Sequence, residues 1–216
     1  MARGLVVGED GTSRCAWGAG DPVYVAYHDT EWGFPSRDDR HLFEKICLEG
    51  FQAGLSWLTI LRKRENFRRA FANFQPEMVA RFDARRVSRL LRDPGIVRHR
   101  GKIESAIHNA RRSLEIVDEL GSLAAYVWRF EPDASKRPRR LTPAALARLT
   151  ESTESRALSQ DLKRRGFRFV GPTTMYAFLQ SVGIVNDHLE GCGVRPHCEA
   201  ARGRFARPRP RRSRGA

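Results

Sequence analysis

The sequence predicts an all-α fold, and three observations support this prediction. Apolar residues recur at helical spacing in several segments, and capping residues or glycines mark the ends of these segments. No alternating strand pattern of any length interrupts them, and no internal repeat is present. The chain has 216 residues, of which 41% are hydrophobic, enough for a sizeable core in one domain or in two small lobes.

The composition is strongly basic, with a formal net charge of +14 that comes mostly from arginine. Such a balance favours a polyanionic partner, most simply a nucleic acid. Seven arginines and no acidic residue lie from Arg202 onward, so part of the excess belongs to the C-terminal end. The remainder of the chain is still basic, which keeps the nucleic-acid hypothesis for the folded part.

The cysteines and the apolar runs indicate the compartment. Four cysteines, at positions 15, 47, 192 and 198, do not form the dense pattern of a disulfide scaffold. The only apolar run near the N-terminus, Leu5 to Val7, is too short for a signal peptide, and no stretch reaches the length of a membrane span. We therefore expect a cytoplasmic protein without a membrane partner.

The N-terminal region combines aromatic residues with turn residues. Residues 1–14 are expected to form a flexible arm, and residues 15–33 a loop with a single helical turn, because glycines and Asp21-Pro22 interrupt them. The rings either pin this loop to a core, which is the commoner outcome, or wall a site for a flat ligand. These rings are Trp17, Tyr24, Tyr27 and Trp32.

Two helices are expected next. Ser36 followed by Asp39 resembles a capping box, and Leu42, Phe43 and Ile46 give the first helix an inward stripe. Ser56 caps the second helix, whose apolar face begins at Trp57 and whose opposite face carries arginines and Lys63. That basic face is either simply solvated or directed at phosphates.

Further helices fill the middle of the chain. The apolar spacing predicts a short helix through Val87 and Leu90 that ends at Pro94-Gly95, a long helix to about Leu120 and a short helix within residues 121–130. Residues 131–141 are polar and contain prolines, which is typical of an exposed loop. Thr142-Pro143 is a good helix start, a cap followed by a first-turn proline.

Residues 162–182 are interpreted as two helices joined by a glycine-containing hairpin. Gly166 ends the first helix, and Gly171-Pro172 opens the second. Such an element can direct backbone N–H groups and a helix dipole at a phosphate, with Lys163 and Arg164 adding charge. An αα-hairpin that only packs is the simpler alternative. The remaining residues, 194–216, are basic and poor in apolar residues, and we expect them to be disordered.

Glu49 is the most conspicuous carboxylate, because it follows three apolar residues and precedes Gly50-Phe51. A glutamate in this setting either lies in solvent at a helix end or lines a pocket. Burial among apolar groups is costly unless a cation or a hydrogen bond meets the charge, so the residues alone favour the solvated interpretation.

Two cysteines and two histidines near the ends of the chain form a candidate metal site. Cys15 and His28 lie near one end, and His188 and Cys192 near the other. This set suits tetrahedral zinc, and four protein ligands leave no open position, so the role would be structural. Free thiols and solvated histidines are the alternatives. His197 and Cys198 are substitute ligands, though they lie in the segment expected to be disordered.

Several long blocks resemble one known family. The aromatic segment from Cys15 to Gly33, the runs CLEGFQAGLSWLTILRKRENFR and GIVRHRGKI, and the runs KRRGFRFVGPTTMYAF and GIVNDHLEGC look like those of the bacterial DNA-3-methyladenine glycosylase I family. The blocks keep the family order and cover roughly Cys15 to Cys192. The resemblance implies a helix-hairpin-helix DNA glycosylase fold over residues 15–193, with its terminal segments joined by a zinc ion.

The resemblance also implies particular roles for residues. Glu49 would contact the damaged base, which replaces the solvated interpretation. The matching metal ligands are Cys15, His28, His188 and Cys192. The rings expected to line the base pocket are Trp17, Tyr24, Tyr27, Trp32 and Trp57, and the DNA-binding positions are Lys163, Arg164, Gly166 and Gly171.

The implied activity is hydrolysis of the N-glycosidic bond of 3-methyladenine in double-stranded DNA, by a monomer in the bacterial cytoplasm. No lysine after the hairpin suits a Schiff-base nucleophile, so a monofunctional enzyme that leaves an abasic site is expected. Asp187 lies at about the distance after the hairpin where many members of the wider superfamily carry an aspartate that stabilises the sugar cation. The resembled family is unusual in lacking that arrangement, and orientation of the adjacent His188 is the alternative role, so Asp187 stays outside the catalytic set. A zinc-stabilised DNA-binding module without catalysis is the alternative function, whereas a zinc hydrolase would need an open metal position.

Overall fold

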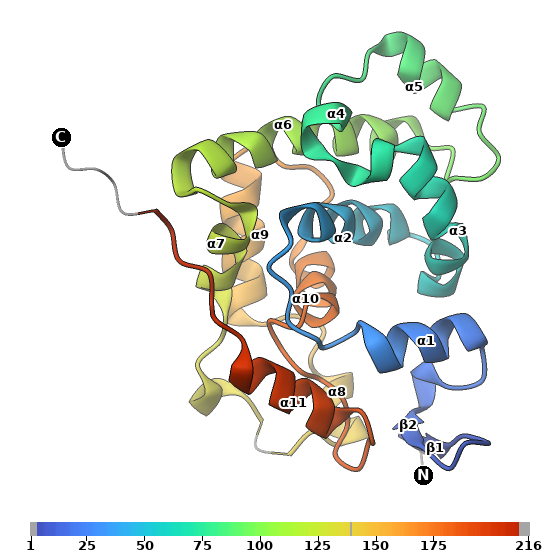
Figure 1. The fold of residues 1–216 in the computed structure, drawn as a ribbon, viewed down its shortest axis with the longest axis vertical. Coiled ribbons are helices and arrows are strands. Elements are labelled where there is room, and N and C mark those ends of the chain that lie inside the picture. Colours follow the sequence, from blue (N-terminus) through green and yellow to red (C-terminus); the bar gives the residue numbers. More distant parts are fainter. Residues whose placement is uncertain (1–3, 139, 212–216) are drawn as a thin grey trace.

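The computed structural model describes residues 4–138 and 140–211 of the chain. Helices dominate it, as the sequence predicts, and they surround the long central helix α2 (Figure 1). The elements are β1 (Leu5–Val7), β2 (Ser13–Cys15), η1 (Ala16–Gly18), α1 (Pro22–Thr30), α2 (Asp39–Gln52), α3 (Trp57–Ala70), η2 (Ala72–Phe74), α4 (Pro76–Val79), α5 (Ala84–Leu90), α6 (Arg100–Leu120), α7 (Leu123–Val127), η3 (Trp128–Phe130), η4 (Ala134–Lys136), α8 (Pro143–Ala147), α9 (Thr153–Arg164), α10 (Pro172–Ser181) and α11 (Arg195–Arg204).

Helix α2 forms the middle of the hydrophobic core. All residues from Leu42 to Phe51 are buried, and the helix contacts α3, α6, α7 and α10. A helix that is buried on every side brings its polar residues into the interior as well. For this reason Glu44, Lys45 and Glu49 lie inside the protein rather than on its surface.

The capping of α2 differs from the expectation. Asp38, not Ser36, caps this helix, because its carboxylate accepts hydrogen bonds from the backbone N–H groups of Arg40 and His41. The carboxylate of Asp39 instead accepts hydrogen bonds from the N–H groups of Leu123 and Ala124, at the start of α7. One carboxylate thus satisfies donors at the beginning of another helix that packs against α2.

The N-terminal region is more ordered than expected. The segment expected as a flexible arm contains an antiparallel hairpin in which Leu5 pairs with Cys15 and Val7 with Ser13, while residues 1–3 lie outside the described part. Residues 22–30, expected as a loop, form helix α1 because Asp21 caps it and Pro22 occupies its first position. The residues that suggested a break in fact start a helix.

The C-terminal segment is also ordered, contrary to the expectation of disorder from residue 194. Residues 195–204 form α11, and Phe205 packs on Trp128 with ring centroids 4.5 Å apart. Arg202 and Arg207 pair with Glu131. The partly buried carboxylate of Glu131 and the apolar ring of Phe205 therefore order this segment in spite of its basic composition. Residues 212–216 lie outside the described part.

No helix of residues 4–138 and 140–211 is both long enough and apolar enough to cross a bilayer. The hairpin of the predicted helix–hairpin–helix element lies between α9 and α10, which pack against each other. The two ends of the fold also meet: the N–H of Gly193 donates to the carbonyl of Ser13 in β2 at 2.8 Å. This closure brings the N-terminal aromatic segment next to the C-terminal segment.

Candidate functional site: an aromatic pocket beside a metal-ligand cluster

Aromatic rings from three segments enclose a cavity of about 280 Å³. Trp17 and Trp32 form one corner, with ring centroids 4.7 Å apart and nearly perpendicular planes. Tyr27 and Trp57 form the next, with centroids 5.5 Å apart. Glu49 of α2 completes the wall, so the structure brings together one carboxylate and four of the five rings expected in the pocket.

Tyr24, the fifth ring, is not among the residues that line the cavity. Its ring packs edge-on against Trp17, with centroids 5.9 Å apart. Its hydroxyl accepts a hydrogen bond at 3.1 Å from the backbone N–H of Leu58, in the first turn of α3. That N–H has no acceptor within its own helix, so Tyr24 supports the wall by fixing the start of the helix that carries Trp57.

Glu49 is buried, with only 5% of its surface exposed. Burial raises the pKa of its carboxyl to about 7; Lys45 and the Ser181 hydroxyl act in the opposite direction, and Glu31 adds to the rise. An ionised carboxylate in such a place favours a cation in the cavity. The solvated interpretation of Glu49 is therefore wrong for this fold.

A buried ionic network lies behind the pocket. Lys45 is completely buried, and its Nζ donates to the Tyr27 hydroxyl at 3.0 Å and to Glu31 Oε1 at 2.9 Å. Arg64 of α3 donates to both carboxylate oxygens of Glu31 and to Glu44. Lys45 was not among the predicted site residues, although its position four residues before Glu49 places both on one face of α2.

Other lining residues also escaped the sequence analysis. Gln52 is one helical turn after Glu49, which is a usable signal. The remaining ones come from α8, from the residues just after it and from α10, and nothing in the sequence connects them with α2. They are Leu146, Leu149, Ala177 and Gln180.

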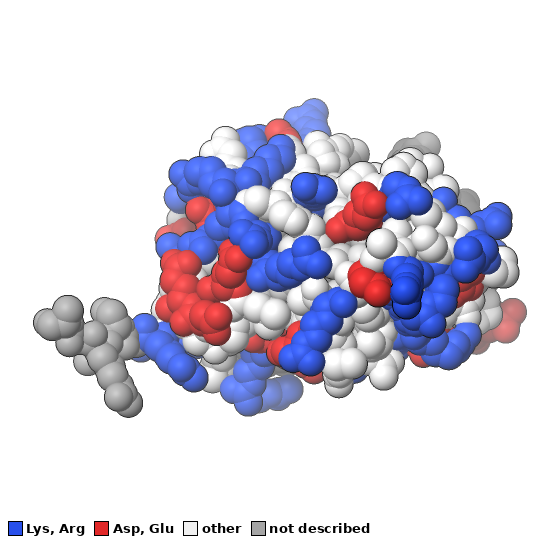
Figure 2. Space-filling model, turned by 90° about the horizontal axis from the view of Figure 1, so that it is seen from above, with Lys and Arg blue, Asp and Glu red and all other residues white. Residues whose placement is uncertain are grey.

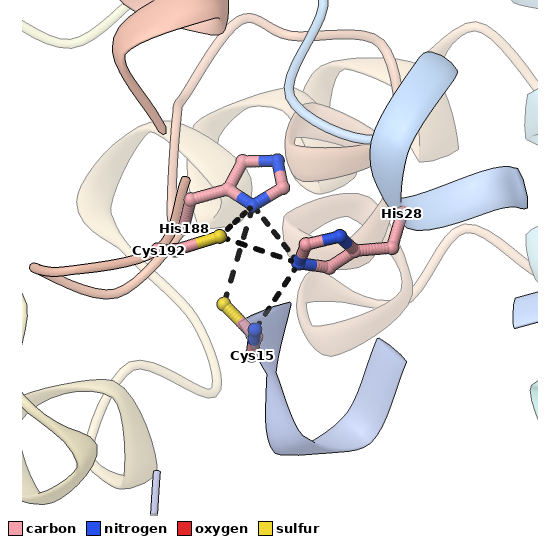
Figure 3. Close-up of side chains that lie close together, drawn as sticks. All are labelled: Cys15, His28, His188 and Cys192. Atoms are coloured by element: carbon pink, nitrogen blue, oxygen red, sulfur yellow. Dashed lines mark hydrogen bonds between the residues drawn. The ribbon is translucent and has the colours of Figure 1, made fainter. Parts of the chain in front are cut away.

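The four predicted metal ligands converge at one point (Figure 3). The ligand atoms of Cys15, His28, His188 and Cys192 all lie within 4.8 Å of one another, and all four residues are buried. His188 Nδ1 lies 3.1 Å from His28 Nε2 and 3.4 Å from the Cys192 sulfur. A tetrahedral ion with ordinary metal–ligand lengths separates its ligands by roughly 3.3–3.8 Å. The cluster therefore has the composition and spacing to hold a metal ion.

The surroundings of the two histidines turn one nitrogen of each ring toward the cluster. His28 Nδ1 lies 2.7 Å from a carboxylate oxygen of Asp29, which is itself held by Arg14. His188 Nε2 lies 2.9 Å from the carbonyl oxygen of Trp32. Donation of these N–H groups outward turns the lone pairs of His28 Nε2 and His188 Nδ1 toward the cluster, as metal ligands require, and His28 Nε2 there accepts a hydrogen bond from the N–H of Cys15 at 3.4 Å.

The two thiols need a cation if both are to ionise. Hydrogen bonds with Cys15, His188 and His28 lower the pKa of Cys192 more than burial raises it. The hydrogen bond to Cys192 and burial raise the pKa of Cys15. The substitutes considered from the sequence lie apart: His197 is exposed, and the Cys198 sulfur contacts the carbonyl of Trp32.

The pocket and the cluster share a wall. The Trp17 ring lies against His28, with centroids 5.3 Å apart, and the Trp32 ring lies against His188 at 4.7 Å. Both tryptophans line the cavity on their other side. Any ion that fixes the two histidines would therefore fix two rings of the pocket.

Asp187 is fully buried and bound on both carboxylate oxygens. It pairs with Arg137 and accepts hydrogen bonds from the Tyr176 hydroxyl at 2.7 Å and from Gln180 Nε2 at 2.8 Å. Its carboxylate does not contact the His188 ring, so the suggestion that it orients this ligand is wrong. It instead orients Gln180, which lines the cavity.

The hairpin between α9 and α10 is anchored next to the pocket helix. Asn109 of α6 hydrogen-bonds both backbone groups of Arg168, each at 2.9 Å. Gly166 has a φ of +87°, which favours glycine at a helix end. A Cβ on Gly50, the neighbour of Glu49, would lie 3.2 Å from the Cβ of Phe169, so this glycine allows the hairpin to approach α2 closely.

The predicted DNA-binding positions have different environments. Lys163 and Arg164 are exposed at the end of α9, although Arg164 pairs with Asp161. Arg165 pairs with Glu119 and with Asp161, which makes it less available to a phosphate. Gly171 precedes Pro172 at the start of α10 and has no side chain to cap this helix.

A cavity walled by rings and one ionisable carboxylate, beside a helix–hairpin–helix element, defines a helical protein that can hold a planar, positively charged ligand. Comparisons with known proteins give the family. A model of the methyladenine glycosylase family matches residues 17–196. The chain is 48% identical over 184 residues to DNA-3-methyladenine glycosylase 1 of Escherichia coli (strain K12), covering 85% of this chain and 97% of that protein.

Solved structures agree with this result. The crystal structure of 3-methyladenine DNA glycosylase I (TAG) matches with a TM-score of 0.76 and 49% identity, over 83% of this chain and 98% of that one. A variant of a 3-methyladenine DNA glycosylase I in complex with 3-methyladenine matches with a TM-score of 0.79 and 39% identity, over 85% and 97% of the two chains. The chain belongs to the methyladenine glycosylase family, which confirms the resemblance found in the sequence.

Proposed function

We propose that the chain is a monofunctional DNA glycosylase that hydrolyses the N-glycosidic bond of 3-methyladenine in double-stranded DNA and leaves an abasic site. Membership of a family whose relatives bear this name supports the activity. The observation in the molecule itself that carries the proposal is Glu49, a buried carboxylate among four rings in a cavity of about 280 Å³. A base inside duplex DNA reaches such a cavity only when its nucleotide is extruded.

The charge of the substrate explains this pocket. Methylation at N3 makes the base cationic while it is attached to the sugar, so the base is already a good leaving group. The rings offer stacking faces and ionised Glu49 offers the opposite charge. We assign Glu49 and the rings of Trp17, Tyr27, Trp32 and Trp57 to base recognition, with Tyr24 as their support.

The reaction moves the positive charge from the base to the sugar. When the bond between C1′ and N9 breaks, its electron pair stays on N9, and the free base is neutral. The sugar becomes an oxocarbenium ion, to which water adds at C1′ with release of a proton. Stabilisation of a developing cation by a fixed negative group is the usual source of catalysis in such sites; here Glu49 supplies that group, and no covalent enzyme intermediate is needed.

We further propose that the cluster of Cys15, His28, His188 and Cys192 holds a structural zinc ion. Zinc matches the two-sulfur, two-nitrogen donor set, and four protein ligands leave no position for a substrate. When bound, the ion supplies rigidity. It would join β2 and α1 to the C-terminal segment and thereby hold the pocket rings that lie against His28 and His188.

The DNA would lie along the hairpin between α9 and α10. Phosphate binding at a helix N-terminus uses free backbone N–H groups, which α10 offers after Gly171, and Lys163 and Arg164 add charge. Figure 2 shows one face of the molecule, on the side of α4, α5 and α6, where basic side chains outnumber acidic ones. We propose that the protein acts as a monomer in the bacterial cytoplasm, where chromosomal DNA is present.

The test is release of free 3-methyladenine from methylated double-stranded DNA. The wild type is expected to release the base without strand cleavage, and Glu49→Ala is expected to lose at least about a hundredfold in rate, as for loss of one charge-stabilising group. Glu77→Ala, which removes an exposed glutamate from α4, is the matched control and should keep full activity. DNA binding without release by the folded wild type would favour a binding module and contradict the proposal.

A further inference from the structure

Lys45 is the one fully buried lysine of the described chain that lies against the pocket. Its ammonium group lies 4.3 Å from the centroid of the Tyr27 ring and 5.0 Å from that of Trp57. Both rings line the cavity, yet Lys45 itself does not. A buried ammonium is costly unless it is paired, so its place directly behind two pocket rings calls for an explanation.

We propose that Lys45 is a positioning residue of the pocket, which holds the Tyr27 hydroxyl oxygen from behind and, one helical turn from Glu49 on α2, provides the positive charge that favours the ionised carboxylate. This inference rests on the proposed function only for its consequence in catalysis. The contacts that carry it belong to the fold, and they can be tested without the reaction.

The orientation of the Tyr27 hydroxyl follows from donor and acceptor roles. An ammonium group can only donate, so in the 3.0 Å contact the Tyr27 oxygen is the acceptor. The hydrogen of the hydroxyl must then point elsewhere. Lys45 therefore fixes the direction in which the Tyr27 hydroxyl hydrogen points, away from the ammonium group.

The effect on Glu49 follows from the charges that surround it. Lys45 and Glu49 are one helical turn apart on α2. Glu31, just after α1, opposes the ionisation of Glu49, whereas Lys45 and the Ser181 hydroxyl favour it. Arg64 of α3 is committed to Glu31 and Glu44, and Lys102 of α6 to the carbonyl groups of Phe51 and Ala53. Lys45 also binds Glu31, but it is the fully buried cation that lies one turn from Glu49 on the same helix.

This arrangement has a consequence for the substrate. Burial alone would protonate Glu49 around neutral pH and leave the pocket without its negative charge. Lys45 lowers the pH at which the carboxylate forms, and Glu31 in turn balances Lys45 at 2.9 Å. The cavity can thus present a carboxylate to a cationic base although its surroundings are apolar.

The experiment compares the pH dependence of the wild type with that of Lys45→Met, a variant of similar length without the charge. The first measurement follows the ¹³C resonance of the Glu49 carboxyl with pH, and the second follows base release from methylated DNA at the same pH values. The expected result is a shift of both midpoints to higher pH by about one unit. Release at pH 7 should fall about fivefold and recover toward the wild-type rate at pH 9.

Lys136→Met is the matched control, because it removes an exposed lysine of η4 and leaves the pocket untouched. Its midpoints should equal those of the wild type. If Lys45→Met does not fold, as judged by circular dichroism, Lys45→Gln removes the charge while it keeps a polar group beside Glu31.

A Glu49 midpoint in the folded variant within about 0.2 units of the wild type would overturn the proposal, because the expected shift is several times larger. A loss of release that is equal at every pH would assign Lys45 a packing role and also overturn it. A wild type that releases no base would contradict the proposed function, whereas the carboxyl titration would still decide the role of Lys45.

Discussion

The metal-ligand cluster and the aromatic pocket are neighbours that bury similar groups in opposite ways. In the cluster, each imidazole has an outward partner, Asp29 or the Trp32 carbonyl, and four inward atoms face one another. In the pocket, Glu49 has no salt-bridge partner within 4 Å in the described part of the chain, and burial raises the pKa of its carboxyl to about 7. A buried polar group whose partners lie within the protein stabilises the fold, whereas a buried carboxyl without an ion-pair partner is available to a ligand.

The largest effect is expected from a substitution that disrupts the metal-ligand cluster. If the cluster holds zinc as proposed, Cys15→Ala should remove most of it and lower the melting temperature by more than about 10 °C, because metal binding by such sites contributes directly to folding. Metal analysis and thermal unfolding provide the measurements. Cys198→Ala, a buried cysteine that contacts Trp32 rather than the cluster, should keep its zinc. Unchanged zinc content in Cys15→Ala would exclude this residue as a ligand.

The next effect concerns the uncompensated carboxyl of the pocket. The pKa of Glu49 in the folded protein, about 7, lies above its ordinary value of 4.5. Between these values the folded protein retains a proton that the unfolded chain has released, so its stability falls as the pH rises through this range. Glu49→Gln does not titrate and should therefore be more stable than the wild type above pH 7, by up to roughly 3 kcal/mol.

Urea unfolding of Glu49→Gln and of the wild type at pH 5 and pH 8.5 measures this difference. The difference in stability should be small at pH 5 and near its maximum at pH 8.5, and the variant is expected to be less active than the wild type. A stability difference that does not change with pH would show that the pKa of Glu49 is not raised in the folded protein. The pocket would then bury its charged group as favourably as the metal-ligand cluster does.

A smaller effect is expected for the support of the pocket wall. Tyr24→Phe removes the acceptor of the Leu58 N–H but keeps the ring against Trp17. Loss of one hydrogen bond costs about 1 kcal/mol, so the free energy of unfolding should fall by this amount and base release by less than about tenfold. Denaturant unfolding and single-turnover release measure both quantities. A loss of release as large as that of Glu49→Ala would place Tyr24 in contact with the base.

The smallest effect concerns the hairpin. Lys163→Ala removes an exposed charge at the end of α9. The association constant for DNA should therefore depend less steeply on salt, and the magnitude of the negative slope of log K against log salt concentration should fall by about one. Arg165→Ala is the control, because Arg165 is already paired with Glu119 and Asp161 and should change the slope less. Equal slopes for Lys163→Ala and the wild type would place the DNA elsewhere.

Much of the helical fold was predictable, because local signals act within a few residues. Ser56 caps α3, Thr142 caps α8 and Gly166 follows α9, as expected from the sequence. The errors concern residues whose partners are distant. Asp39 accepts hydrogen bonds from the first N–H groups of α7, which Ser122 caps, rather than completing a capping box at α2. Arg202 is ordered by Glu131, which lies 71 positions earlier.

The sequence by itself determined the helical class, the family and the identity of the four cluster residues, because long motif blocks and residue types are local properties of a chain. Only the tertiary structure decided that Tyr24 supports the wall, that Asp187 binds Gln180 and that Lys45 lies behind Tyr27. The physical reason is that the cost and the use of a buried charge depend on which groups surround it. Those groups come from α1, α3 and α10, which folding alone brings to α2.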